Sequence, residues 1–432
     1  MSLSHVNEVG SIIRKVRRER GLRLEDLADE NISPATISNI ERGVSHVKQD
    51  KVLYLMEKLD VSMENIPYLL LKNKDEMTHI RFQLDTVESL KRLNHLDKAL
   101  DILKKVNMTE DHPFSSEYYW LKGVCHLFLK KYKKAERDLT NAIRLSHQND
   151  MAKQGNIEAY SFNDLSLCYY YRNDLEQALQ YVDSGLDAFH PEGDRKIIKY
   201  ILTKNKCIYL ERLGQTIPAL RIVDHIWDEL PLIKKSETYL SFYWLKGELL
   251  RKCGAYEEAI SYAREGMLLA SENKQYNLAF DLWTVLGSAY QGLNDWDKAE
   301  ECFDVALMLA EEHVTDNRLI RGYIQLGELK MCQEKWDEAQ NILMKSIEKS
   351  KELSTSYLID ANMKMGHLYR KQKKNKQAIS YYHMSVELAQ KLRLKEKEYQ
   401  GWYNLAKCWK GVDENEFRQA SENMFKVEEE IQ

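Results

Sequence analysis

The residues of this sequence with the clearest chemical potential are six basic side chains near its beginning. Between positions 14 and 23 they are accompanied by a single acidic residue, Glu19. Arginine and lysine neutralise phosphates, and a local basic stretch can do so even on a chain whose net charge is -4. The stretch predicts contact with a nucleic-acid backbone and consists of Arg14, Lys15, Arg17, Arg18, Arg20 and Arg23.

A second group of candidate side chains follows at the predicted start of a helix. Ser33 suits the N-cap, and Pro34 suits the first helical position because its missing amide hydrogen is not needed there. Ile37 and Ile40 would face inward, so the remaining side chains over 34–41 would face outward, where polar groups can reach base edges. The outward residues are Pro34, Ala35, Thr36, Ser38 and Asn39.

Motifs for catalysis or cofactor binding do not occur in the sequence. It contains no glycine-rich phosphate loop, no nucleophile elbow and no His-Glu-x-x-His pattern. The seven cysteines are widely spaced and lack the close pairs of zinc sites, so we expect them to be small buried thiols. We therefore expect no enzyme activity, no metal site and no cofactor.

A compact helical domain over residues 1–72 would position the basic and polar side chains. Hydrophobic residues recur at helical spacing up to Gly21, and further helices are predicted at 24–29, at 35–41 closed by Gly43, at 48–59 and at 63–72. Residues 73–80 would form a linker or begin the first helix of the following region. The spacing thus predicts a five-helix N-terminal domain.

This domain resembles the Cro/C1-type helix-turn-helix of phage repressors and bacterial regulators. The resemblance is carried by Leu27-Ala28, Ser33, Thr36-Ile37-Ser38 and Ile40-Glu41-Arg42-Gly43. It implies double-stranded DNA as a partner, with the third helix in the major groove. In that family bases are read from the positions of Ala35, Thr36 and Asn39, while the backbone is touched by Arg42, Ser45, His46 and Lys48. The full set of DNA-binding candidates is Arg14, Arg18, Arg23, Ser33, Pro34, Ala35, Thr36, Ser38, Asn39, Arg42 and Lys48.

Two positions depart from the usual helix-turn-helix pattern. Leu24 stands where a glutamine usually begins the second helix, which puts that phosphate contact in doubt. Asn31 lies near the place of the usual turn glycine, and asparagine tolerates the left-handed conformation. We therefore expect a left-handed Asn31 and a preserved fold.

Residues 76–432 repeat an alanine at intervals of 36 to 43 positions. In most units an aromatic or aliphatic residue stands three positions before the alanine and a small residue twelve before it, so that two helices can pack closely. This is the tetratricopeptide pattern, in about eight repeats with C-terminal capping helices near 401–432. The repeated alanines are Ala99, Ala135, Ala178, Ala219, Ala259, Ala299, Ala339 and Ala378, and the small residues are Gly123, Ser166, Cys207, Gly247, Gly287, Gly327 and Gly366.

A helix-turn-helix followed by tetratricopeptide repeats of longer than usual period resembles the RRNPP regulators of Gram-positive bacteria and their phages. The predicted fold class is therefore all-α, with the five-helix domain followed by a right-handed tetratricopeptide superhelix, an α-solenoid. The resemblance implies a quorum-sensing transcription regulator: a homodimer that binds DNA and a short signalling peptide and controls sporulation, protease production or virulence.

The first helices of successive repeats should line the concave side, so exposed residues on these helices would define the groove where a peptide binds. Asparagine offers a donor and an acceptor to a peptide backbone, while arginine or lysine can hold a terminal carboxylate. Tyr170 and Trp244 could form apolar pockets. The inward positions are Asn163, Tyr170, Lys204, Asn205, Trp244, Arg251, Asp281, Gln291, Arg321, Gln325, Glu328 and Arg370.

Two other functions are compatible with the same sequence. The repeats could sequester a response-regulator protein, alone or in addition to DNA binding, or the chain could be an adaptor whose helix-turn-helix does not bind DNA.

No apolar run is long enough to span a membrane, so we expect no membrane partner and a cytoplasmic protein. The peptide, the operator and the direction of regulation stay open.

Overall fold

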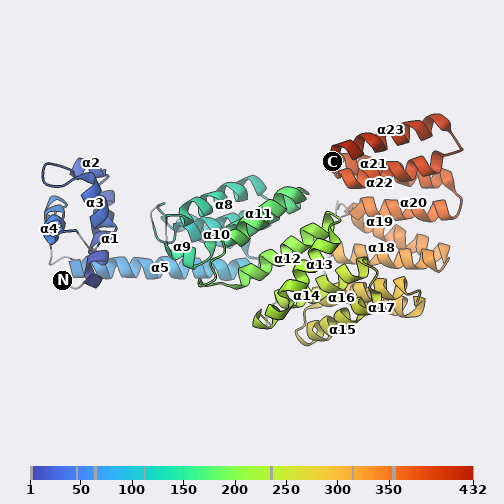
Figure 1. Ribbon diagram of the computed structural model, residues 1–432, viewed down its shortest axis with the longest axis horizontal. Helices are drawn as coiled ribbons and strands as arrows, with labels where there is room; N and C mark the ends of the chain where they lie inside the picture. The colour runs from blue at the N-terminus through green and yellow to red at the C-terminus, as the bar shows by residue number, and fades with distance from the viewer. Residues whose placement is uncertain are drawn as a thin grey trace. The chain divides into compact units, whose positions relative to one another are not determined.

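The computed structural model describes residues 3–44, 47–62, 66–110, 112–148, 150–233, 237–313, 316–352 and 357–431. Over these ranges it contains 23 α-helices and one 3-10 helix and no strand, which confirms the predicted all-α class. The chain divides into two compact units, residues 1–152 and residues 153–432. Figure 1 shows that helices adjacent in sequence pair as hairpins through most of the chain.

The first unit begins with four short helices around one hydrophobic core. They are α1 (Leu3–Glu19), α2 (Leu24–Leu27), α3 (Pro34–Glu41) and α4 (Gln49–Lys58). Ile13 of α1, Ile37 of α3 and Leu55 of α4 are fully buried together in this core. The predicted inward positions Ile37 and Ile40 are confirmed.

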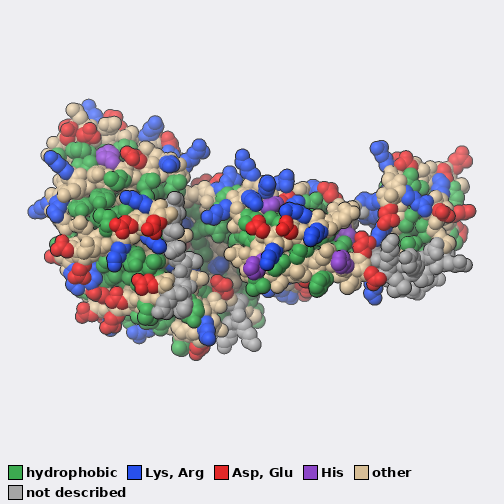
Figure 2. Space-filling model, turned by 180° about the vertical axis from the view of Figure 1, so that it is seen from behind, with side chains coloured by type: hydrophobic (Ala, Val, Ile, Leu, Met, Phe, Trp, Pro, Cys, Tyr) green, Lys and Arg blue, Asp and Glu red, His purple; other side chains and the backbone are tan. Residues whose placement is uncertain are grey.

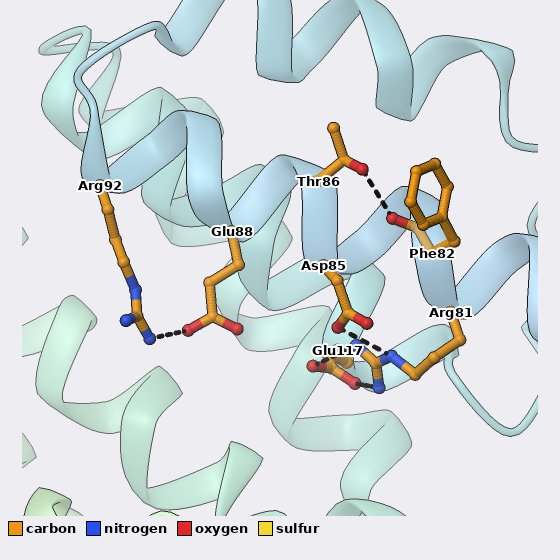
Figure 3. A network of polar contacts seen from close by, with 7 residues as sticks. All are labelled: Arg81, Phe82, Asp85, Thr86, Glu88, Arg92 and Glu117. Atoms are coloured by element: carbon orange, nitrogen blue, oxygen red, sulfur yellow. Dashed lines mark hydrogen bonds and ion pairs between the residues drawn. The ribbon is translucent and has the colours of Figure 1, made fainter.

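Helix α5 (Ile66–Arg92) begins in the N-terminal core and continues without interruption for 27 residues. Residues 73–80 therefore lie inside this helix. Figure 3 shows how α5 is tied to α7: the Arg81 guanidinium donates through both Nη atoms to Glu117, at 2.8 and 2.9 Å, and through Nε to Asp85 at 3.0 Å. The hydrogen bonds to Glu117 raise the pKa of Arg81.

The remaining helices of the first unit form hairpins. Helix α5 pairs with α6 (Leu96–Lys105), and α7 (Ser115–Phe128) pairs with α8 (Tyr132–Ser146). The short helix α9 (Asp150–Gln154) follows.

The second unit is a row of hairpins, each made of two helices. The hairpins are α10 (Ile157–Tyr171) with α11 (Leu175–Asp187), α12 (Ile197–Arg212) with α13 (Thr216–Ile226), α14 (Glu237–Lys252) with α15 (Tyr256–Glu272), α16 (Tyr276–Gly292) with α17 (Trp296–His313), α18 (Asp316–Cys332) with α19 (Trp336–Glu352), α20 (Tyr357–Lys371) with α21 (Asn375–Leu392), and α22 (Lys395–Trp409) with α23 (Glu414–Ile431). The 3-10 helix η1 (Trp227–Ile233) extends α13.

The repeated alanines mark the second helix of each hairpin. All eight are fully buried, and each second helix from α6 to α21 begins three residues before its alanine. The turn that precedes these helices holds one residue with positive φ, two positions before the helix start. This residue is Gly214 or Gly254 in two turns, but Lys130, Glu334 and Lys373 occupy it in others.

The small residues twelve positions before the alanines make room for one large side chain. A Cβ on Gly287 would lie 2.8 Å from the Phe303 ring, and a Cβ on Gly366 would lie 2.5 Å from the Tyr382 ring. Gly123 and Gly327 face leucines in the same way. In these hairpins, the close packing predicted from the alanine and the small residue also involves a third position: a bulky side chain four residues after the alanine packs against the glycine.

First helices contact the next first helix along the row, as α12 contacts α14 and α14 contacts α16, whereas consecutive second helices have at most marginal contact within the described ranges. The first helices therefore form the inner layer. On the face shown in Figure 2, acidic and basic side chains are interspersed over the surface. Among the described helices, none combines the length and the apolar character that a membrane span requires.

Candidate DNA-binding and ligand-binding sites

The third helix, α3, begins with the capping geometry that the sequence predicts. The Ser33 hydroxyl accepts the Thr36 amide hydrogen at 3.2 Å and lies 2.9 Å from the Thr36 hydroxyl, with Pro34 at the first helical position. Ser33, Pro34 and Ala35 are exposed, whereas Thr36, Ser38 and Asn39 are half-buried. The N-terminal end of α3 is thus available to a partner.

Helix α1 holds α3 by a close backbone approach. A Cβ on Gly10 would lie 2.2 Å from the carbonyl oxygen of Ile40, so only glycine fits at this crossing. Beside it, Arg17 Nε donates to Glu41 Oε1 at 2.6 Å and Nη2 donates to Oε2 at 2.9 Å. The third donor, Nη1, reaches the carbonyl oxygen of Leu22 at 2.7 Å. This buried pair fixes the C-terminal end of α3.

The turn between α2 and α3 is organised by Asp29. Its carboxylate accepts the amide hydrogens of Asn31 at 2.8 Å and Ile32 at 3.0 Å, the Tyr54 hydroxyl at 2.5 Å, and an ion pair from Lys58. Lys58 and then Tyr54 hold the pKa of Asp29 well below its usual range. The turn therefore depends on the side chain of Asp29.

Two expectations for this turn are wrong. Helix α2 ends at Leu27 rather than near residue 29, and Asn31 does not have a positive φ. The reason is the same in both cases. The Asp29 side chain accepts the amide hydrogens of Asn31 and Ile32, and these two hydrogen bonds form the turn after α2 without a left-handed residue.

The basic residues between positions 14 and 23 serve different purposes. Arg18 and Arg23 are exposed and Arg14 is half-buried, so a phosphate backbone can approach these candidates. Arg17, however, is 7 % exposed and bound to Glu41, and Lys15 pairs with Glu76 of α5. Part of the basic stretch is therefore structural, which its composition did not indicate.

Beyond α3, Lys48 is exposed at the start of α4, and Ser45 and His46 lie outside the described residues. The exposed Arg42 folds back over α3. Its Nη2 donates to Asn39 Oδ1 at 2.6 Å, and its Nε donates to the carbonyl oxygen of Ser38 at 3.3 Å. Because Arg42 occupies the Asn39 oxygen, the Asn39 amide presents its N–H groups, which suit a base acceptor.

In the second unit, two predicted ligand residues form a hydrogen bond between neighbouring first helices. Asn205 Nδ2 of α12 donates to Asn163 Oδ1 of α10 at 2.9 Å, and Asn163 Nδ2 donates to Asp164 at 3.1 Å. Both asparagines are buried rather than exposed as we expected, because they pack between helices. Next to them, burial lowers the pKa of Lys204.

Tyr170 of α10 belongs to an aromatic group on the same layer. It stacks on Tyr209 of α12 with ring centroids 5.2 Å apart, and the Arg212 guanidinium lies 5.0 Å from its ring. Burial raises the pKa of Tyr170, and Tyr357 of α20 contributes to the shift. The stacked pair and Arg212 thus join two neighbouring first helices, α10 and α12.

Asp281 of α16 is buried between two arginines of α18. Arg318 donates to Asp281 Oδ2 through Nε at 3.1 Å and Nη2 at 3.0 Å, and Arg321 Nη2 donates to Oδ1. Arg321 Nε and Gln325 Oε1 are buried and have no hydrogen-bond partner among the described residues. The cluster therefore retains an unused donor and an unused acceptor one helical turn apart.

The other predicted ligand residues vary in their environment. Arg251 is bound by Glu248 at 2.7 and 2.8 Å, and Glu328 pairs with Lys364 at 2.6 Å. Trp244 packs partly against the core, Gln291 Nε2 lies 3.6 Å from Cys332 Sγ, and Arg370 is exposed at the end of α20.

Cys332 and Cys253 are exposed, so the expectation that all cysteines are buried is wrong.

Several residues of these sites were missed by the sequence reasoning. Arg318 could have been found, since it lies three positions before Arg321 and hence on the same helix face. Glu41 offered a weaker signal, a carboxylate inside an otherwise uncharged helix. Tyr209 offered none, because its stacking on Tyr170 depends on how α10 and α12 pack.

Comparisons with protein families identify both parts of the chain. A helix-turn-helix family model matches residues 13–66, and tetratricopeptide repeat models match 116–149, 240–273, 282–317 and 359–391. No curated protein sequence matches the chain. The predicted helix-turn-helix and repeats are therefore confirmed.

Three solved structures with a similar fold are of two proteins, a Rap protein and the quorum sensor NprR. A Rap protein complexed with Competence and Sporulation Factor is 13 % identical, with a TM-score of 0.60, over 82 % of this chain and 99 % of that one. The apo quorum sensor NprR from B. thuringiensis is 14 % identical, with a TM-score of 0.54, over 86 % and 99 %. NprR in complex with its cognate peptide NprX is 10 % identical, with a TM-score of 0.54, over 81 % and 89 %. These similarities establish a shared fold.

Proposed function

We propose that this chain, which has the helix-turn-helix, the tetratricopeptide repeats and the fold of the RRNPP regulators, is a DNA-binding transcription regulator controlled by a short signalling peptide. The DNA would be met by the exposed end of α3, with Ala35, Thr36 and Asn39 toward the bases. Arg14, Arg18, Arg23, Arg42 and Lys48 would contact the phosphate backbone. The peptide would lie along the inner layer of first helices.

The observation that carries the proposal is the inner layer itself. Polar and aromatic side chains of neighbouring first helices contact one another there: Asn163 and Tyr170 of α10 contact Asn205 and Tyr209 of α12, and Asp281 of α16 binds two arginines of α18. Among the described residues, Asn205 forms a hydrogen bond only through its amide nitrogen, to Asn163, so its carbonyl oxygen can accept from a ligand. An extended peptide needs such donors and acceptors along its length, and NprR, a protein of similar fold, binds a peptide.

Control of DNA binding requires that the peptide favour one arrangement of the protein over another. In a homodimer the two helix-turn-helix domains would meet two half-sites, whose spacing depends on that arrangement. A peptide that binds one arrangement about 100-fold better shifts the equilibrium by about 2.7 kcal/mol. Activation and repression are equally compatible with this scheme.

The test is binding of the purified chain to DNA from upstream of its own gene, followed by fluorescence anisotropy over a salt series. We expect sequence-specific binding that changes on adding pooled short peptides from the source culture. Asn39→Ala should reduce discrimination against unrelated DNA, whereas Arg18→Ala should weaken binding to both DNAs and lower the salt slope by about 1.

The response to peptide has its own matched pair of variants. Asn205→Ala should abolish the response, and Asn415→Ala, an exposed asparagine at the start of α23, should leave it intact. DNA binding that ignores every peptide would instead favour the alternative in which the repeats bind a response regulator. Absence of DNA binding at all salt concentrations would contradict the proposal and favour the adaptor.

A further inference from the structure

We propose that the inner layer recognises the C-terminal residue of its peptide at Arg321 and Gln325 of α18. The proposal rests on the proposed function, because it specifies which part of the peptide binds at one place in the same site. It is argued from the charge balance of the cluster around Asp281 and from two buried polar atoms that have no partner among the described residues.

The first step is the charge balance of the inner layer. Glu248 is matched by Arg251, and Glu328 is matched by Lys364. Asp281, however, faces two guanidinium groups, Arg318 and Arg321. Glu248, which is paired with Arg251, also acts on Arg321, so two carboxylates face three guanidinium groups and the cluster keeps one positive charge for an anionic group.

The second step is the unused hydrogen-bonding capacity. Arg321 binds Asp281 through Nη2, and its Nε–H is buried without an acceptor among the residues that the structure describes. Leaving a buried donor unsatisfied is unfavourable, and more so for a charged group. A ligand carboxylate would supply the missing acceptor, and guanidinium–carboxylate hydrogen bonds are among the strong ones.

The third step distinguishes the kind of carboxylate. Gln325 follows Arg321 by one helical turn, and its Oε1 is a buried acceptor to which no described residue donates. The ligand should therefore offer an anion and an N–H group close together. The last residue of a peptide has both, since its carboxylate is adjacent to its own backbone amide.

The test uses affinity selection and mass spectrometry with three pools of random synthetic heptapeptides on the full chain. One pool has free C-termini, one has amidated C-termini, and one has free C-termini but no Asp or Glu. We expect both free-terminus pools to be retained at least tenfold better than the amidated pool. Arg321→Gln should remove this preference, and Gln325→Leu should reduce it.

Arg221→Gln is the matched control, because Arg221 is an exposed arginine of the second helix α13, outside the inner layer of first helices. It should keep the preference for free C-termini. Arg321→Lys, which keeps the charge and loses the Nε donor, should have a reduced preference, and thermal unfolding followed by circular dichroism would verify that each variant is folded.

The outcomes separate the two proposals. Equal retention of the free and amidated pools would overturn recognition of the C-terminus while leaving peptide binding intact. A requirement for Asp or Glu rather than for the free terminus would overturn it in favour of an acidic side chain. Retention of no pool would contradict the peptide-controlled function itself.

Discussion

Replacing Arg17 should unfold the helix-turn-helix rather than merely weaken its contact with DNA. Its guanidinium forms two hydrogen bonds to Glu41 and one to the carbonyl oxygen of Leu22, and both side chains of the pair are less than 10 % exposed. Arg17→Met leaves the Glu41 carboxylate buried without its cation. Breaking a buried pair in this way costs about 3–5 kcal/mol, against a total of about 5–15 kcal/mol for a typical domain.

Hydrogen exchange measured by mass spectrometry resolves the effect on this part of the chain. A loss of about 3 kcal/mol raises the population of the open state about 100-fold, so the amides of α3 should exchange about 100-fold faster in Arg17→Met. The control is Arg18→Met, which alters an exposed neighbour in the same way and should change exchange by about twofold or less.

A double variant tests the physical cause. Arg17→Met combined with Glu41→Leu removes both charges and should restore most of the protection, since an apolar pair can replace a buried ion pair at little cost. If Arg17→Met left exchange of the α3 amides unchanged and lowered the salt slope of DNA binding by about 1, Arg17 would be a phosphate contact and our reasoning would be refuted.

Three further predictions concern the packing, the turns and the pH dependence. Gly10→Ala should destabilise the N-terminal domain by about 1–3 kcal/mol or more and abolish specific DNA binding, because the new Cβ would displace the backbone of Ile40. Urea unfolding would measure this loss of stability, and an unchanged unfolding midpoint would contradict the prediction. Glu334 has a φ of 59°, a left-handed conformation that glycine adopts more easily than glutamate, so Glu334→Gly should raise the stability of the repeats by up to about 1 kcal/mol in thermal unfolding. The control is Glu348→Gly, at an exposed position inside α19, which should lower the stability by about 1 kcal/mol. Burial lowers the pKa of His367 from 6.5 to about 4, so His367 takes up a proton at a higher pH in the unfolded chain than in the folded one. The free energy of unfolding should therefore fall by about 2 kcal/mol between pH 7 and pH 5. His367→Gln should remove this part of the pH dependence.

The starts of the helices could be predicted from the sequence because local rules fix them. Ser33 and Pro34 define the start of α3 through an N-cap and a first helical position, and α3 begins there. The residues three positions before the repeated alanines begin the second helices because each alanine must face the partner helix at a fixed register. The length of α5 was not predicted, since one helix supplies both the N-terminal core and the first hairpin.

The partners of charged side chains were decided by tertiary structure. Arg17 and Arg18 are adjacent in the same basic stretch, yet one is buried against Glu41 and the other is exposed, because only one of them faces α3 when α1 packs on it. Likewise, Arg318 and Arg321 converge on Asp281 only because α16 and α18 lie side by side. The sequence determined the starts of the helices and their repeat through local periodicity, while the packing of helices against one another decided which polar side chains are buried, which charges are compensated and which remain for a ligand.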